Sequence, residues 1–376
     1  MVEKALIAML KTHPIRSVYL SLYLYIYKNQ NLIIKNLLSF SLQRGVVDAA
    51  KPIIEEEIAT KLDVGHVFST HVKPFRIADF GCSTGHNSFP AMQIITESVQ
   101  KKFRSETSQI PDFQVLFNDQ VFNDFNTLFR SIPPQKNYHA AAVAGSFHER
   151  LLPKASLDFA YCSCALNWIS EVPKAVRDDT SPAWNKGRVH YTGAVQEVFE
   201  AYSNRYANDI GSFLEARAEE LVSGGLMTLL VPAAPCFEHS ETFYTTQSEL
   251  ELIGSCLVDM AKKGLIGEEK VDTFNFPLYF TIPQELKAII ERSNSFSIER
   301  MEILNNPGKC TLRSADARAT YLRATCEGLL KNHFGSEVMD ELFDRYTKKI
   351  AASPLFLDPD NEKSIIILVI LKRKAE

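Results

Sequence analysis

The chain has 376 residues and a formal net charge of −4, with 45% hydrophobic and 23% charged residues. This length and composition are typical of a soluble globular protein that can bury a sizeable core. The small negative charge argues against a nucleic-acid partner, because phosphate binding needs clustered lysine and arginine.

The first 42 residues differ in character from the rest of the chain. The stretch Ser17–Tyr27 is apolar and aromatic, but it is shorter than the ~20 residues that a membrane span needs. Lys28–Asn31 interrupts it before Leu32–Ile34 resumes, and no small-x-small cleavage site follows. We therefore expect an atypical N-terminal segment over residues 1–42, without a membrane span and without secretion.

Helical and strand patterns alternate after this segment. Apolar residues recur at helical spacing over Arg44–Leu62, which predicts an amphipathic helix packed on a sheet. Helical stretches then alternate with four apolar strands, at Phe75–Phe80, Phe113–Phe117, His139–Val143 and Leu157–Tyr161. This βαβ alternation predicts a parallel sheet.

The second half of the chain adds a long helix, an insertion and two late strands. The long helix, Gly193–Val222, is expected to end at Gly224–Gly225 and to lead into a strand at Leu226–Val231. Residues from about 238 to 290 lack the alternation and predict a helical cap over the carboxyl edge of the sheet. The remainder suits an antiparallel end of the sheet, with strands Phe296–Ile303 and Ser364–Lys372 and helices Ala315–His333 and Ser336–Ile350.

The turn after the first strand is the strongest sign of a ligand site. Gly81 and Gly85 flank small polar residues there, and glycine lets the backbone approach a ligand closely. Ligands bind at the carboxyl ends of parallel strands in such sheets. The turn contains neither Gly-x-Gly-x-x-Gly nor a P-loop lysine, which favours a cofactor without a pyrophosphate. The alternative is an ordinary glycine-containing βα turn.

Asp119 ends the second predicted strand. Its carboxylate could accept hydrogen bonds from the hydroxyls of a ribose, which is the behaviour expected beside a nucleoside-type cofactor. The alternative role for Asp119 is to cap the N-terminus of the next helix.

Six ordered segments resemble the plant SABATH methyltransferases, which use S-adenosylmethionine (SAM) to methylate small carboxylic acids or xanthine-type rings. The segments are Ala78–Asn87, Phe117–Asn126, Ala144–Pro153, Asn167–Pro173, Ala183–Lys186 and Asp272–Pro277. The resemblance implies an α/β, Rossmann-like methyltransferase fold over residues 43–376, with a mostly parallel seven-stranded sheet and a helical cap.

The resemblance also implies which residues contact SAM. Asp119 is expected to hold the ribose, and Ser146 and Phe147 the adenine; Phe147 as a core residue is the alternative. Ser163 and Cys164 are expected to line the pocket. The full set of expected contact positions is Asp79, Cys82, Asn87, Asp119, Gln120, Ser146 and Phe147.

A carboxylate is already ionised at neutral pH, so its methylation needs alignment and water exclusion rather than a general base. The resemblance implies that Gln43 and Trp168 donate hydrogen bonds to the carboxylate and are the catalytic pair. Asn167, beside Trp168, is expected to contact the rest of the substrate. A core tryptophan is the alternative for Trp168.

A magnesium site and a homodimer are further implications of the resemblance. Oxygen ligands suit a hard cation, and the expected ligands are Asn185, Asp272, the carbonyl of Phe274, and Asn275. Three histidines have no metal-ligand spacing and are expected at the surface or at the pocket rim: His148, His190 and His239.

Residues 35–40 depart from the family pattern. Lys35 and Asn36 stand where Ser-Tyr is expected, and Ser39 and Phe40 where Asn-Ser is expected, whereas Gln43 is kept. These residues would contact the methionine end of the cofactor and the substrate, so the departure favours a non-catalytic protein that binds a small acid.

Seven cysteines include no Cys-x-x-Cys pair, which predicts buried free thiols in a reducing compartment. The leading hypothesis is therefore a cytoplasmic SAM-dependent methyltransferase that esterifies a small organic acid. An N-methyltransferase acting on a xanthine-type ring and the non-catalytic acid-binding protein are the alternatives.

Overall fold

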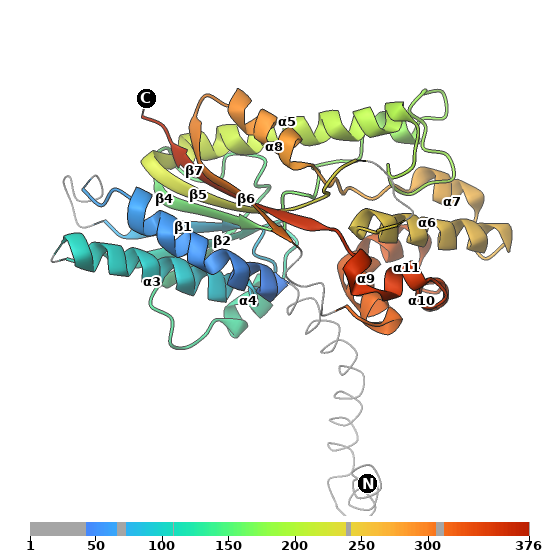
Figure 1. Cartoon of the computed structure of the whole chain (residues 1–376), viewed down its shortest axis with the longest axis horizontal. Coiled ribbons are helices and arrows are strands. Elements are labelled where there is room, and N and C mark those ends of the chain that lie inside the picture. Colours follow the sequence, from blue (N-terminus) through green and yellow to red (C-terminus); the bar gives the residue numbers. More distant parts are fainter. Residues whose placement is uncertain (1–42, 66–72, 108, 238–241, 306–311, 376) are drawn as a thin grey trace, which may run out of the picture.

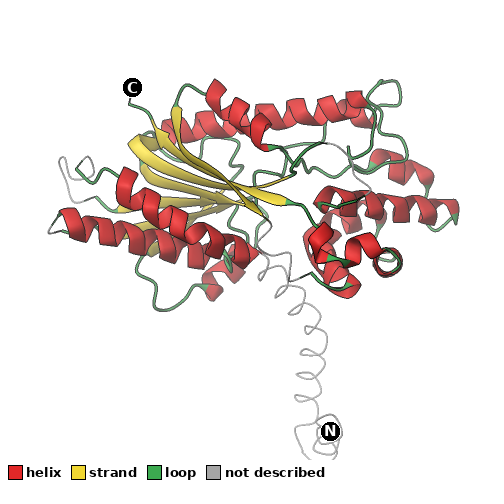
Figure 2. Ribbon diagram, viewed as in Figure 1, coloured by secondary structure: helices red, strands yellow, loops and turns green. Residues whose placement is uncertain are grey.

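The computed structural model describes residues 43–65, 73–107, 109–237, 242–305 and 312–375. Within them, the strands form one sheet, drawn in yellow in Figure 2. This sheet has seven strands in the order β3-β2-β1-β4-β5-β7-β6. The first five strands are parallel, and β7 runs antiparallel to both of its neighbours. The strands are β1 Phe75–Phe80, β2 Phe113–Asp119, β3 His139–Ala144, β4 Leu157–Ser163, β5 Leu221–Ala233, β6 Phe296–Asn305 and β7 Ile365–Arg373.

Helices cover both faces of the sheet (Figure 1). One face packs against a helix over residues 43–61, α3 (Ser88–Glu106) and α4 (Phe125–Ser131). The other face packs against α5 (Gln196–Glu220) and α8 (Pro283–Arg292). The apolar periodicity of these segments therefore forms two cores, and the expected fold class is confirmed.

A separate group of helices lies beyond one end of the sheet (Figure 1). They share a third apolar core and form the cap: α6 Thr246–Lys262, α7 Glu268–Thr273, α9 Ala315–Phe334, α10 Met339–Ala351 and α11 Pro354–Leu357. The range expected for the cap, about 238 to 290, holds only the first two of these helices, and α8 within it packs on the sheet instead. Short 3-10 turns occur at Lys174–Arg177 and Pro359–Asn361.

Gly224–Gly225 does not end the long helix, contrary to the sequence prediction. Helix α5 ends at Glu220 and the strand β5 begins at Leu221, so both glycines lie inside the strand. The pairing of β4 with β5 shifts register between Leu157 and Phe159, and Gly224 has a φ of +77°. The two glycines lie at a bulge in the sheet, and Gly224 adopts the positive φ that the bulge requires.

The parallel direction of β1 to β5 brings their carboxyl ends to one edge of the sheet, where a ligand crevice is expected. In the part of the chain that the structure describes, no helix has the length and apolar character of a membrane span. The N-terminal residues 1–42 and the altered positions Lys35, Asn36, Ser39 and Phe40 lie outside the described residues, as does His239.

Candidate functional site

A cavity of about 780 Å³ lies at the carboxyl ends of β1, β2 and β4. The segments that follow the first four strands supply most of its wall, because parallel strands end at the same edge of the sheet. The wall includes every residue that was expected to contact or line the cofactor pocket: Asp79, Cys82, Asn87, Asp119, Gln120, Ser146, Phe147, Ser163 and Cys164. The structure thus brings these residues together, while their individual roles stay predictions.

Gly81 and Gly85 shape the floor of this cavity. Both have a positive φ, of +84° and +91°. A Cβ on Gly81 would lie 2.4 Å from the Cβ of Ala165, and one on Gly85 would lie 2.2 Å from the ring of Phe89. Only glycine therefore fits these two positions, as the sequence predicted for a turn that approaches a ligand.

Asp119 fixes the turn through its carboxylate. It accepts hydrogen bonds from the backbone N–H of Ser83 at 2.7 Å and of Gln120 at 2.8 Å. Ser83 has a φ of +49°, and Cys164 across the cavity has a φ of +55°; such strain in non-glycine residues is concentrated at functional sites. Asp124, not Asp119, caps α4, so the remaining lone pairs of the Asp119 carboxylate are available to a ligand.

Asp79 is a buried carboxylate on the cavity wall. It is 2% exposed, and its Oδ2 atom has no hydrogen-bond partner. The pKa of Asp79 is raised to about 7, mainly by burial; a hydrogen bond with Ser88 opposes this shift, and the negative charge of the nearby Asp119 adds to it. An unpartnered acidic oxygen in this position would favour a positively charged ligand group.

The loop after β3 presents Ser146 and Phe147 to the cavity. The ring of Phe147 contacts Phe213 of α5 edge-on, with ring centroids 6.0 Å apart, and lies 4.6 Å from the His148 ring. Phe147 is only half-buried, so part of its ring is free to pack on a ligand. That exposure argues against a pure core role.

Gln43 and Trp168 line the same cavity as the residues expected to contact the cofactor. Gln43 Oε1 accepts a hydrogen bond of 2.6 Å from Asn87 Nδ2, which leaves the Gln43 amide N–H groups to donate elsewhere. Trp168 is half-buried rather than enclosed in the core. The expected donors for a carboxylate therefore lie on the wall next to the predicted cofactor contacts.

Asn167 does not line this cavity. It is 7% exposed, its backbone carbonyl accepts from the N–H of Tyr279 at 2.8 Å, and its Oδ1 has no partner. Asn167 lies in a turn closed by a hydrogen bond of 3.0 Å from the Trp168 N–H to the Ala165 carbonyl, and Trp168 pairs with Leu278 in an isolated β-bridge. A substrate contact for Asn167 stays a prediction that the cavity itself does not support.

The expected magnesium ligands lie close together away from the cavity wall. Asn185 Nδ2 donates to Asn275 Oδ1 at 2.6 Å, and both residues are buried. Asp272 accepts from the N–H of Gly187 at 2.7 Å. Asn185 Oδ1 has no hydrogen-bond partner. The described residues contain no group of three or more His, Cys, Asp or Glu that could hold a metal, so a cation here would depend on amide and carbonyl oxygens.

Two of the three histidines expected at the surface or pocket rim lie in the described residues, and their surroundings differ. His148 lines the cavity, as expected for the rim. His190 is 2% exposed, and its ring contacts Thr192 Oγ1 at 2.7 Å and the Leu278 carbonyl at 3.1 Å. Burial lowers the pKa of His190 to about 3. The expected surface or rim position is wrong for His190, which is a neutral core residue.

Sequence reasoning missed the contribution of α9 to the cavity. Ala324, Thr325 and Leu329 line it from the cap side, and Tyr161 lines it from β4. The α9 segment has small or polar residues at positions 324, 325 and 328, but charged and polar residues also occur throughout the rest of this helix. The sequence therefore offers no signal that distinguishes a cavity wall from a solvated face.

Comparison with known proteins agrees with this geometry. Residues 39–374 match the family described as SAM dependent carboxyl methyltransferase. The loganic acid O-methyltransferase of Catharanthus roseus is 45% identical over 337 residues, covering 89% of this chain and 90% of that protein. Paraxanthine methyltransferase 2 of Arabidopsis thaliana is 40% identical, covering 81% and 86%.

The likeness extends to a solved structure. A loganic acid methyltransferase with S-adenosylhomocysteine (SAH) is 44% identical and superposes with a TM-score of 0.84, covering 89% of this chain and 94% of that one. The chain therefore belongs to the family of SAM-dependent carboxyl methyltransferases, as its motifs predicted.

Proposed function

We propose that this protein transfers a methyl group from SAM to the carboxylate of a small organic acid. The observation that carries the proposal is one cavity whose wall holds the expected cofactor residues together with Gln43 and Trp168. A methyl donor and an acid held in that cavity would lie next to each other. Family membership supports the same activity.

The wall fits a cationic nucleoside cofactor. Gly81 and Gly85 leave room for close approach, while Asp119 and the unpartnered Oδ2 of Asp79 supply negative charge. When bound, SAM supplies a methyl group attached to a positively charged sulfur. The two carboxylates favour binding of that positive charge, because charges attract more strongly where water is excluded.

The acid would be held by neutral donors. No lysine or arginine is present among the described residues that line the cavity. Gln43 and Trp168 can donate N–H groups to the carboxylate and orient one oxygen toward the methyl group. A carboxylate without a lysine or arginine partner keeps its electron pairs available to attack the methyl group. Alignment of the carboxylate oxygen with the methyl group, together with the exclusion of water, then lowers the barrier to methyl transfer.

The test is a substrate panel with isotope-labelled SAM and detection of methyl esters by mass spectrometry. The panel includes loganic acid, because a loganic acid O-methyltransferase is 45% identical, and aromatic and aliphatic acids of similar size. We expect ester formation from at least one acid. Normal SAH binding with no ester from any acid would contradict the proposal and favour the non-catalytic acid-binding alternative.

N-methylation of a xanthine-type ring is the second candidate, because paraxanthine methyltransferase 2 is 40% identical. The same panel therefore includes xanthines. Transfer to an acid requires the ionised carboxylate, so its rate should fall as the acid is protonated, whereas transfer to a ring nitrogen should not follow that titration. Transfer to xanthines alone would replace the acid as substrate.

We also propose that Mg²⁺ binds at Asn185, Asp272, Phe274 and Asn275. The buried, unpartnered Oδ1 of Asn185 and the Asp272 carboxylate support a site for a hard cation. A single carboxylate makes the binding weak and the role structural. Mg²⁺ should raise the melting temperature of the wild type more than that of Asp272→Asn; equal shifts, or none, would contradict the site.

A homodimer in the cytoplasm completes the proposal. The motif resemblance supports the dimer, and Phe122 and Phe129 are apolar side chains that are 98% and 42% exposed and that a second copy could cover. Six described cysteines, which form no disulfide, support a reducing compartment. Light scattering after gel filtration tests the homodimer, and imaging of a fluorescent fusion tests the cytoplasmic location.

A further inference from the structure

The loop between β3 and β4 must hold Ser146 and Phe147 in place, yet it has little regular structure of its own. Gly145 donates its N–H to the carbonyl of Asp119, and Glu149 donates to the carbonyl of Ser146, both at 3.0 Å. These two bonds fix the start of the loop but not the orientation of the Phe147 peptide group. Other contacts must set it.

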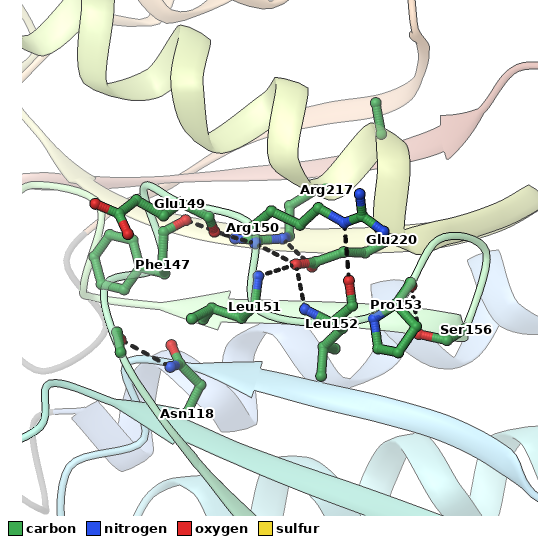
Figure 3. A network of polar contacts seen from close by, with 12 residues as sticks. Asn118, Phe147, Glu149, Arg150, Leu151, Leu152, Pro153, Ser156, Arg217 and Glu220 are labelled. Carbon is green, nitrogen blue, oxygen red and sulfur yellow. Dashed lines mark hydrogen bonds and ion pairs between the residues drawn. The ribbon is translucent and has the colours of Figure 1, made fainter.

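A buried ion pair at the end of α5 makes those contacts (Figure 3). Arg217 and Glu220 are fully buried and join Nε to Oε2 at 2.7 Å. Arg217 also donates to the carbonyl of Phe147 at 2.6 Å and to that of Glu149 at 2.9 Å. One guanidinium therefore holds two successive points of the loop.

Glu220 holds the loop a few residues further on. Its Oε1 accepts from the N–H groups of Leu151 at 2.5 Å and of Leu152 at 2.8 Å, and from Arg217 Nη2 at 3.0 Å. The carboxylate and the guanidinium thus satisfy two backbone donors and two backbone acceptors of one loop. Figure 3 shows the side chains of the pair converging on this backbone.

The opposite side of the loop is held by Asn118 at the end of β2. Asn118 Nδ2 donates to the carbonyls of Val143 at 2.8 Å and Gly145 at 3.0 Å. In Figure 3 it lies on the other side of the loop from the ion pair. The segment that carries Ser146 and Phe147 is therefore fixed between two buried polar anchors.

The Arg217 guanidinium also packs against two aromatic rings near Phe147. It lies 4.1 Å from the ring centroid of Phe80 and 5.1 Å from that of Phe213, and Phe213 meets the Phe147 ring edge-on. Neither Arg217 nor Glu220 is among the residues that line the cavity. Their influence on a ligand would act through Phe147 and Ser146.

We propose that Arg217, paired with Glu220, is a positioning residue for the adenine side of the cofactor site. The inference rests on the proposed SAM-binding function and adds a residue set to it. Lysine could not replace Arg217, because a planar fork with several N–H groups is needed to reach Glu220, Phe147 and Glu149 together. A shift of about 1 Å in a binding group is enough to weaken a site.

A purely structural role for the pair is the alternative. Replacing a buried ion pair by neutral residues of similar size is often close to neutral for stability, whereas removing one partner leaves an unpaired buried charge. The test therefore uses the double variant R217M/E220Q, which carries no unpaired charge and keeps an acceptor for Leu151 and Leu152. It removes the donors to Phe147 and Glu149.

The matched control is R318M/E249Q in the cap. Arg318 and Glu249 form another ion pair in the protein interior, 2% and 5% exposed, and neither residue lines the cavity. Thermal melting measures the stability of both variants, and calorimetry measures the affinity of each for SAH. We expect SAH binding to be roughly tenfold weaker in R217M/E220Q, which corresponds to the loss of about one charge-assisted hydrogen bond. SAH binding in the control should be unchanged.

Steady-state kinetics adds a readout that stability alone does not move. The KM for SAM should rise in R217M/E220Q while kcat at saturating SAM stays near that of the wild type. Equal SAH affinity in wild type and R217M/E220Q would overturn the inference. If the double variant does not fold, R217K is the deciding variant, and wild-type affinity in folded R217K overturns it equally.

The proposed function fails in a different way. If the wild type itself does not bind SAH, the cofactor assignment is wrong and the positioning role is overturned with it. If the wild type binds SAH and R217M/E220Q binds it equally well, the proposed function stands and only the positioning role of Arg217 is overturned.

Discussion

Compared with the wild type, Asp79→Asn should gain stability as the pH rises and should bind SAM more weakly. Asp79 is 2% exposed, its Oδ2 has no partner, and burial raises its pKa to about 7. Asparagine has nearly the same shape but cannot carry the charge. The variant therefore isolates the cost of ionising one buried group.

The size of the effect follows from linkage between protonation and folding. The pKa of Asp79 is higher in the folded protein than in the unfolded chain, so the folded state binds more protons between the two values and loses stability as pH rises. A shift from 3.8 to about 7 corresponds to roughly 4 kcal/mol in full. Between about pH 5 and pH 8, the stability of Asp79→Asn relative to wild type should grow by about 2 to 3 kcal/mol.

Urea unfolding of the cofactor-free wild type and of Asp79→Asn at both pH values measures this difference. All other titrating groups are common to the two proteins, so their contributions largely cancel. SAM affinity, measured by calorimetry, should fall in the variant, because the acidic oxygen that favours the positively charged sulfur is lost. If the stability of the two proteins changed with pH in parallel, or if Asp79→Asn gained stability over the wild type at acidic pH instead, Asp79 would not be a buried group that is costly to ionise.

Two further substitutions test the floor and the wall of the cavity. Gly81→Ala should destabilise by about 1 to 3 kcal/mol, because it combines strain at positive φ with a clash against Ala165; urea unfolding measures it. Gly211→Ala, in open space on α5, is the control and should be neutral or stabilising by up to ~1 kcal/mol. Trp168→Phe keeps an aromatic ring but loses the N–H, so the KM for the acid should rise roughly tenfold while SAH affinity stays unchanged. An unchanged KM for the acid would remove Trp168 from substrate binding.

The sequence by itself determined the order and type of most elements. Buried strands such as Phe75–Phe80 are short apolar runs, and the helices between them have a clear apolar face, so local pattern was sufficient. It also indicated the need for Gly81 and Gly85, because their positive φ belongs to the backbone of one turn; the close approach of Ala165 to Gly81 was decided by the tertiary structure. The resemblance of six motifs then identified the family.

The tertiary structure decided what depends on contacts between distant segments. It placed α9, which the sequence analysis expected at the antiparallel end of the sheet, in the cap and on the cavity wall. It buried His190, and it placed Asn167 outside the set of residues that line the cavity. It also revealed the contacts that Arg217 and Glu220 make to the loop that carries Ser146 and Phe147, about 70 residues earlier. Hydrophobic periodicity gives the buried side of an element but not its partner, because the partner is set by chain topology and packing.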